Sequence, residues 1–267
     1  MSTSSQQSGS AKAQSELWGA RVRDWVDVQE STVRSLYEAV MVKPGIDPGA
    51  SVLDVGCGAG LFCELAAKHG AKVSGLDATS AFIAIARERT PRGDFHVGEM
   101  ENLPFDDESF DIVMGCNSFQ YAANPVHALS EARRVARDGA HVIVATWGKP
   151  QDCEFTALMA ALRPLLPPPP PGAPGPFALS EDGALEALAR QAELSPVQVE
   201  EVETLWDYAD EATALRGNLS SGPFVRAINL SGAERVSEAV RQALVPFRNA
   251  DGHVRLRNKF RYLVARR

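Results

Sequence analysis

The chain has 267 residues, of which 45% are hydrophobic and 23% charged, a composition typical of a globular protein with a buried core. Its 27 Lys and Arg against 34 Asp and Glu give a net charge of −7, which argues against a general nucleic-acid binder. The chain has neither the run of about 18 apolar residues that spans a bilayer nor, in the polar Met1–Ser15, the apolar core of a signal peptide. The four cysteines lack C-x-x-C spacing, so we expect no disulfide framework and no metal, and a cytoplasmic location.

The N-terminal region divides into two segments. Residues 1–14 are rich in Ser and Gln and are predicted to be disordered. Residues 15–45 are predicted to form N-terminal cap helices, because apolar residues recur at three- and four-residue intervals. Ser31 is a candidate helix cap within this stretch, and Pro and Gly residues end the pattern after Val42.

Between residues 46 and 150, short apolar runs alternate with helical patterns. This alternation predicts a parallel sheet with helices on both faces, in an α/β domain. The expected strands are Ser51–Val55, Ala71–Leu76, Phe95–Val97, Phe110–Met114 and His141–Trp147, and the expected helices are Leu61–His69, Thr79–Arg89 and Pro125–Arg137.

Residues 151–267 do not continue this regular alternation of strands and helices. They are predicted to hold lid insertions and the C-terminal part of the same sheet. The proline-rich stretch Pro164–Pro176 predicts an extended loop. Two helical patterns between residues 209 and 247 are split at Ser220–Pro223. The remaining expected elements are a helix at Glu181–Ala192 and strands at Val197–Trp206 and His253–Val264. In the last strand apolar and basic residues alternate, with Asn258 as the interruption, and its basic face is expected to be solvated or to have acidic partners.

A glycine-rich loop, DVGCGAG at residues 54–60, lies between the first predicted strand and the first predicted helix. Alternate glycines permit a sharp turn and a close approach of ligand to main chain, and parallel sheets bind ligands at this edge. A dinucleotide loop would need a third glycine at position 61, where the chain has Leu61, and a P-loop would need Gly-Lys-Ser/Thr. Both nucleotide interpretations are therefore disfavoured.

Five motifs between residues 50 and 147 together resemble the class I S-adenosylmethionine-dependent methyltransferases, in the branch of UbiE and methyltransferase type 11. They are the glycine loop, Gly75–Asp77, Gly98–Phe105, Ser109–Val113 and Glu131–Val135. The resemblance implies a Rossmann-like, seven-stranded, mostly parallel sheet with helical lid insertions. It also implies S-adenosyl-L-methionine as cofactor and S-adenosyl-L-homocysteine as product.

The resemblance also implies a role for single residues toward each part of the cofactor. Asp54, Gly56, Cys57, Gly58 and Gly60 would hold the methionine part, Asp77 and Ala78 the ribose, Glu99, Met100, Glu101 and Leu103 the adenine, and Asn117 and Ser118 would line the path to the acceptor. Glu99 stands where the family usually has Asp. The alternatives are that Asp77 caps a helix, that Glu99 is a solvated acid, and that Cys57 and Cys63 only pack. The helical spacing of Trp18, Trp25 and Tyr37 is typical of core residues. The alternative is that the cap helices lie over the active site and that one of these aromatic residues contacts the cofactor or the acceptor.

The methyl group of a sulfonium is already activated, so the reaction requires positioning rather than a nucleophile or metal. His127 and Tyr121 are the candidates for a general base, His127 because it begins the helix after the fourth strand. The motifs of nucleobase, glutamine, cytosine-C5, arginine and catechol methylation are absent, which leaves a small organic acceptor methylated on O, N or C.

The acceptor is expected to contact the insertions at residues 148–179 and 209–249 and the cap helices. Their apolar composition indicates a hydrophobic metabolite, in a reaction of secondary metabolism, bound by a monomer or homodimer without nucleic-acid or membrane partners. Their large side chains are Phe155, Leu158, Met159, Phe177, Phe224 and Phe247, with Trp206 and Tyr208 at the strand edge. Three alternatives remain: a non-methylating enzyme of the cyclisation type, an RNA methyltransferase, and a nicotinamide-dependent enzyme, which Leu61 disfavours.

Overall fold

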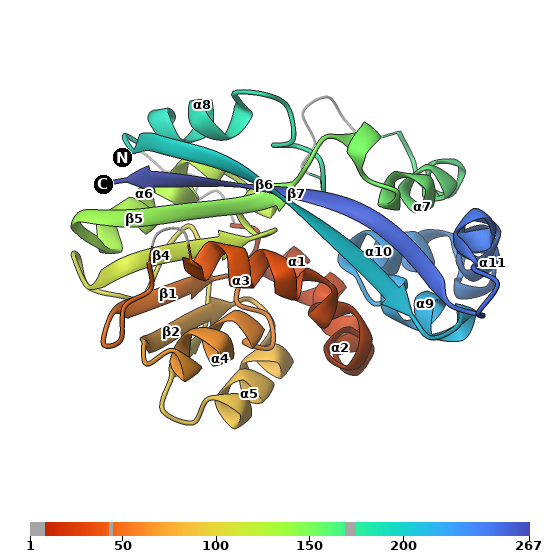
Figure 1. The fold of residues 1–267 in the computed structure, drawn as a ribbon, viewed down its shortest axis with the longest axis horizontal. Coiled ribbons are helices and arrows are strands. Elements are labelled where there is room, and N and C mark those ends of the chain that lie inside the picture. The colour runs from red at the N-terminus through yellow and green to blue at the C-terminus, as the bar shows by residue number, and fades with distance from the viewer. Residues whose placement is uncertain (1–8, 43–44, 169–174) are drawn as a thin grey trace, which may run out of the picture.

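A computed structural model describes residues 9–42, 45–168 and 175–267. Seven strands form one sheet in the order β3-β2-β1-β4-β5-β7-β6 (Figure 1). The neighbours from β3 to β5 pair in parallel, and β7 is antiparallel to both β5 and β6. The strands are β1 (Ser51–Val55), β2 (Lys72–Asp77), β3 (Asp94–Val97), β4 (Phe110–Cys116), β5 (Ala136–Trp147), β6 (Ser195–Tyr208) and β7 (Val254–Arg266). The predicted seven-stranded, mostly parallel sheet is confirmed.

Hydrophobic cores cover both faces of the sheet, because successive strand residues point to opposite sides. In β1, Val52 packs into one core and Leu53 into the other; in β4, Ile112 and Val113 divide in the same way. The first core includes residues of α3 (Arg34–Val42), α4 (Leu61–Lys68) and α5 (Ser80–Arg89), and the second includes residues of α6 (Pro125–Val135) and α8 (Ala184–Gln191). The sheet is thus held from both sides, and its carboxyl edge is left to form the site.

The N-terminal region is helical from residue 11, so the prediction of disorder is wrong for Ala11–Gln14; residues 1–8 lie outside the described residues. The elements are α1 (Ala11–Trp18), a 3-10 turn (Gly19–Arg21), α2 (Val22–Asp24), a π-helical turn (Trp25–Gln29), a 3-10 turn (Glu30–Val33) and α3. The expected cap at Ser31 is also wrong. This residue lies inside the second 3-10 turn, and its hydroxyl donates to the Val28 carbonyl (3.5 Å).

Beyond β5, helices α9, α10 and α11 gather beside the far part of the β6–β7 hairpin, past the ends of β4 and β5 (Figure 1). Their bounds are Glu211–Asn218, Gly222–Ser231 and Ala233–Leu244, and α7 spans Phe155–Leu162. The sequence predicted two helices in this region, and the structure has three. The second predicted helix is divided into α10 and α11 at Gly232, whose φ is +86°. Within the predicted proline loop, residues 169–174 lie outside the described residues.

One boundary prediction near the sheet is wrong. Strand β5 begins at Ala136 rather than His141, with an irregular register against β4 between Phe110 and Ile112, so α6 ends at Val135. Asn258, which interrupts the alternation of apolar and basic residues, lies within β7: it is 2% exposed, and its Oδ1 accepts a hydrogen bond from the Phe155 backbone N–H (2.9 Å). The buried amide thus joins the strand to the start of α7.

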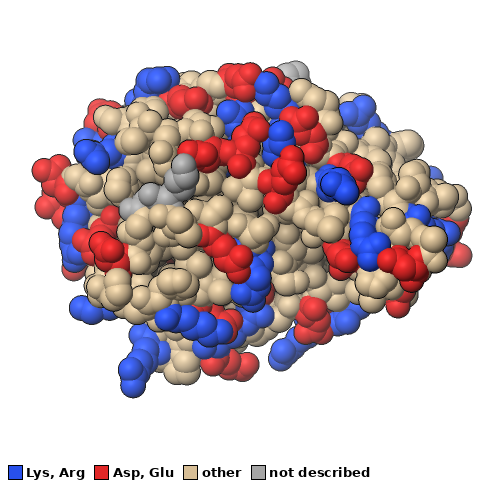
Figure 2. Space-filling model, viewed as in Figure 1, with Lys and Arg blue, Asp and Glu red and all other residues tan. Residues whose placement is uncertain are grey.

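Three basic residues of β7 have acidic partners. Arg255 pairs with Asp207 and Asp251, Lys259 with Glu201, and Arg261 with Asp182. Charges of both signs lie side by side on the face shown in Figure 2. In the described part of the chain, no helix is both long and apolar enough to cross a membrane.

Candidate active site

A cavity lies at the carboxyl ends of the parallel strands. Its floor comes from the turns after β1, β2, β3 and β4, and its roof from the N-terminal helices, α1 above all. The floor residues are Gly56, Cys57, Gly58, Leu76, Asp77, Ala78, Thr79, Phe82, Gly98, Glu99, Met100, Cys116, Asn117, Ser118 and Tyr121; the roof residues are Ser10, Ala11, Gln14, Trp18, Trp25, Glu30, Val33 and Tyr37. This is the edge where parallel sheets bind ligands.

Asp77 ties the glycine loop to β2. Its Oδ2 accepts from the Gly58 backbone N–H (2.9 Å) and its Oδ1 from the Thr79 N–H (2.8 Å). Burial raises the pKa of Asp77. The two backbone hydrogen bonds oppose this effect, but the pKa remains above its ordinary value. Each carboxylate oxygen can accept more than one hydrogen bond, so Asp77 retains capacity toward a ligand while it fixes the loop.

Asp54 lies behind the loop rather than in the cavity wall. It is 2% exposed, and its Oδ1 has no hydrogen-bond partner in the described chain. Burial, and then the charges of Asp77 and Glu30, raise the pKa of Asp54 to about 8. A carboxyl group in this state gains from a nearby cation, which would stabilise its ionised form.

Glu30 is a cavity residue that none of the sequence motifs includes. It is 4% exposed, and it forms an ion pair with Arg89 Nη1 (2.6 Å). The sequence signal that could have identified Glu30 is its position as an acid inside an apolar helical pattern. With Asp77 and Glu99, Glu30 gives the cavity three acids, and none of its described lining residues is Lys or Arg. The site therefore favours a cationic ligand and disfavours a polyphosphate.

Glu99 holds the start of helix α1. Its Oε2 accepts from the Ala11 backbone N–H (2.7 Å), while its Oε1 accepts from the Glu101 N–H (3.2 Å) and the Ser10 hydroxyl (3.4 Å). A carboxylate at a helix N-terminus satisfies free N–H groups and complements the helix dipole. Glu99 therefore anchors the roof of the cavity, and the alternative that it is a freely solvated acid is wrong.

Glu99→Ala is expected to loosen α1 by about 1 kcal/mol, the usual worth of a helix cap. Amide hydrogen exchange should accelerate about fivefold over residues 11–18. The control is Glu101→Ala, because Glu101 accepts from the Ala123 and Asn124 N–H groups before α6 instead. Equal acceleration of α1 in both variants would contradict an anchor specific to Glu99.

Most of the predicted cofactor residues meet at the cavity. Those that line it are Gly56, Cys57, Gly58, Asp77, Ala78, Glu99, Met100, Asn117 and Ser118, joined by Trp18, Trp25 and Tyr37. Gly60 does not line it, and instead brings the start of α4 against Ala86 of α5. Leu103 is 3% exposed in the core, and Glu101 holds the loop before α6. These positions argue against direct cofactor contacts by Gly60, Glu101 and Leu103.

The two candidate bases differ in position. His127 is exposed on α6, where its backbone N–H donates to Asn124 Oδ1 (3.1 Å), and it does not line the cavity. This position argues against a role for His127 as the general base. Tyr121 does line the cavity, but burial raises the pKa of its phenol well above the usual value. At neutral pH Tyr121 is thus a hydroxyl that can donate a hydrogen bond.

Asn117 lines the cavity directly after β4. Its φ of +51° is uncommon for a residue other than glycine, and such conformations cluster at functional sites. Its N–H donates to the Ala145 carbonyl (2.8 Å) and its Oδ1 accepts from Gln120 Nε2 (3.2 Å). These two hydrogen bonds hold the backbone and the side chain of Asn117 in place in the cavity wall.

Comparison with known proteins agrees with this geometry. Residues 53–144 match the family described as Methyltransferase domain. Ubiquinone biosynthesis O-methyltransferase from Maricaulis maris is 35% identical over 118 residues, which cover 42% of this chain and 46% of that protein. The chain spans about half the length of the curated relatives that it matches.

Two solved structures share the fold. The YcgJ protein from Bacillus subtilis superposes with a TM-score of 0.59 at 20% identity, covering 87% of this chain and 98% of that one. The 4+2-cyclase SpnF has a TM-score of 0.56 at 21% identity, covering 87% and 79%. Residues 53–144 therefore match a methyltransferase domain, and the chain shares the fold of these two solved structures.

Proposed function

We propose that the chain transfers the methyl group of S-adenosylmethionine to a small, hydrophobic organic acceptor. The observation that carries this proposal is a second cavity beside the cofactor cavity, which shares five lining residues with it and whose walls are largely aromatic. Both cavities are lined by Trp18, Trp25, Val33, Asn117 and Tyr121. A cofactor and an apolar acceptor could thus meet at Asn117 without passing through solvent.

The residues of the first cavity fit this cofactor, which carries an ammonium and a sulfonium. The acidic lining and the unpartnered Oδ1 of Asp54 favour a cation. Asp77 offers its carboxylate to the ribose hydroxyls, and the loop at Gly56 and Gly58 faces the cavity for the methionine part. Met100 and Glu99 would take the adenine end.

When bound, the cofactor supplies an electrophilic methyl group. The protein's part is to orient the acceptor and exclude water, which can contribute about 7 to 11 kcal/mol of barrier reduction. Asn117 and Tyr121, which line both cavities, are placed to orient the acceptor, with Tyr121 donating a hydrogen bond. The aromatic walls exclude water.

Asp77→Ala is expected to weaken binding of S-adenosylhomocysteine about tenfold or more, because a charged hydrogen-bond acceptor to the ribose is lost. Calorimetric titration measures this change. Asp111→Ala is the control: Asp111 likewise accepts a backbone N–H, from Ser51 (2.8 Å), but at the amino end of β1. Unchanged affinity in Asp77→Ala would contradict the ribose assignment.

Product analysis tests the transfer itself. The protein is incubated with S-adenosylmethionine and fractions of a hydrophobic extract, and S-adenosylhomocysteine should form together with a methylated compound. The alternative is a non-methylating cyclisation, and the observation that supports it is the fold shared with SpnF. It predicts an altered compound with no S-adenosylhomocysteine, and that result would overturn methyl transfer.

A further inference from the structure

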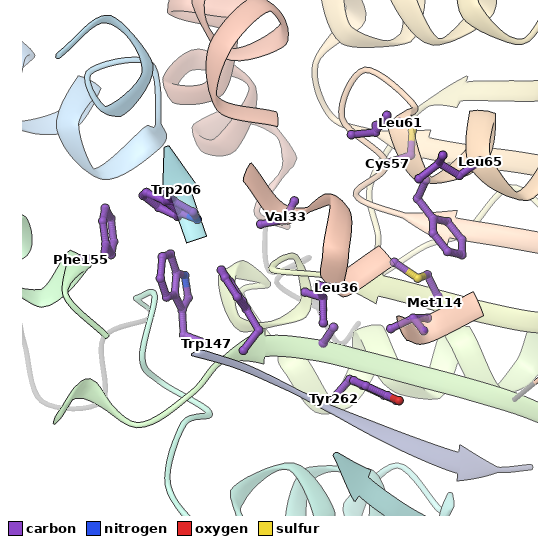
Figure 3. Close-up of a cluster of buried hydrophobic side chains, with 14 of the residues drawn as sticks. Val33, Leu36, Cys57, Leu61, Leu65, Met114, Trp147, Phe155, Trp206 and Tyr262 are labelled. Carbon is purple, nitrogen blue, oxygen red and sulfur yellow. The ribbon is translucent and has the colours of Figure 1, made fainter. Parts of the chain in front are cut away.

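The second cavity, which we call the aromatic cavity, is built around Trp147 at the end of β5. Phe155 of α7 stacks on Trp147 with a centroid distance of 4.5 Å and an interplanar angle of 9°. Phe260 of β7 lies at 4.5 Å and Trp206 of β6 at 5.5 Å from the same ring. Figure 3 shows Trp147, Phe155 and Trp206 together at one end of the core, with Val33 between them and Cys57 of the glycine loop.

This cavity carries an unsatisfied hydrogen-bond donor. Trp206 lines it and is 3% exposed, yet its indole Nε1 has no partner in the described chain. A buried donor left unpaired costs about 1 to 3 kcal/mol, a cost that a ligand with an acceptor atom would remove. The position therefore points to a ligand oxygen.

Three other polar groups of the aromatic cavity already have partners. Gln29 Oε1 accepts from the Tyr208 hydroxyl (2.8 Å), the Thr32 hydroxyl donates to the Gln29 carbonyl (2.6 Å), and the Ser221 hydroxyl donates to the Asn218 carbonyl (3.1 Å). Asp, Glu, Lys, Arg and His are all absent from its described lining residues. A charged ligand group would thus find no counter-ion there, and burying it would be costly.

We propose that the aromatic cavity is the acceptor subsite and binds a flat, uncharged aromatic ring whose oxygen accepts a hydrogen bond from Trp206 Nε1. This inference rests on the proposed function. Offset and edge-to-face contacts with the surrounding rings favour a planar π-system over a saturated one. The opposite end of the ring then points toward Asn117 and Tyr121, which line both cavities.

Two probes of nearly equal shape test the proposal, 2-acetylnaphthalene with a carbonyl oxygen and 2-ethylnaphthalene without one. Binding to the protein saturated with S-adenosylhomocysteine is measured by ligand-detected NMR. The wild type should bind the ketone about tenfold more tightly than the hydrocarbon, which corresponds to about 1.4 kcal/mol. Acetylcyclohexane, which is not planar, should bind more weakly than 2-acetylnaphthalene.

Trp206→Phe retains an aromatic ring and removes the N–H. The ketone and the hydrocarbon should therefore bind this variant with about equal affinity, and the affinity for the hydrocarbon should match that of the wild type. The comparison of the two probes on the wild type keeps the inference falsifiable if Trp206→Phe fails to fold. An equal affinity of the wild type for both probes, or a preference that survives in folded Trp206→Phe, would overturn the inference. Failure of the wild type to bind S-adenosylhomocysteine would instead contradict the proposed function.

Discussion

Gly56→Ala is expected to abolish binding of S-adenosylhomocysteine and to lower the free energy of unfolding by about 2 to 5 kcal/mol. Gly56 has a φ of +79°, which is unfavourable for any residue with a Cβ. A Cβ there would also lie 2.4 Å from Ser118 Cβ, directly after β4. The backbone would have to move away from β4, and the Gly56 and Cys57 N–H groups would lose their bonds to the Leu76 carbonyl (2.7 and 3.0 Å).

Gly58→Ala separates the two causes. Gly58 also has a positive φ, +54°, but a Cβ there would meet nothing within 4 Å. This variant should lose only about 1 to 2 kcal/mol from the backbone conformation. It should nevertheless bind S-adenosylhomocysteine more weakly, if the open space over Gly58 holds the methionine part. Thermal unfolding and calorimetry measure the two effects, and equal destabilisation of both variants would contradict the role of Ser118.

The parts of the fold that were predictable are those with local signals. Each central strand is a short apolar run between turn residues, and the glycine loop marks where the first strand gives way to a helix. Such signals predicted the parallel half of the sheet, and with it the meeting of Asp77, Glu99 and Asn117 at one edge. Parallel strands bring their carboxyl ends together whatever the rest of the chain does.

The parts that were not predictable depend on contacts far apart in sequence. Helix α1 begins in a segment of low hydrophobicity, because Glu99 accepts the Ala11 N–H across 88 positions. Trp18 packs against α10 so closely that a Cβ on Gly222 would lie 2.9 Å from its ring. The place of His127 outside the cavity was not predictable for a related reason: its position after β4 was predicted correctly, but the direction of its side chain depends on the turn of α6.

The acids around the glycine loop lead to a prediction about pH. Asp54→Asn is expected to remove most of the pH dependence of S-adenosylhomocysteine binding below pH 8. In the wild type, burial raises the pKa of Asp54 to about 8, so the ligand-free protein carries a neutral carboxyl at lower pH. The ammonium group of S-adenosylhomocysteine would favour the ionised form, so the affinity of the wild type should rise up to about tenfold per pH unit from pH 6 toward pH 8. Calorimetry across this range measures the slope.

The ligand-free protein provides an independent check, because the same carboxyl affects stability in the opposite direction. An unfolded Asp has a pKa of about 3.9. Between that value and about 8, the folded state holds a proton that the unfolded state has released, so the wild type loses stability as pH rises. Asp54→Asn has no such proton and should be more stable than the wild type at pH 8, with a difference that shrinks toward pH 5.

Asp111→Asn, remote from the loop, should keep the wild-type slope of ligand affinity against pH. The same slope in Asp54→Asn would exclude Asp54 as its source. Because one substitution is expected to stabilise the empty protein and weaken its ligand binding, the buried carboxyl is best understood as a cost in stability that the bound cation offsets.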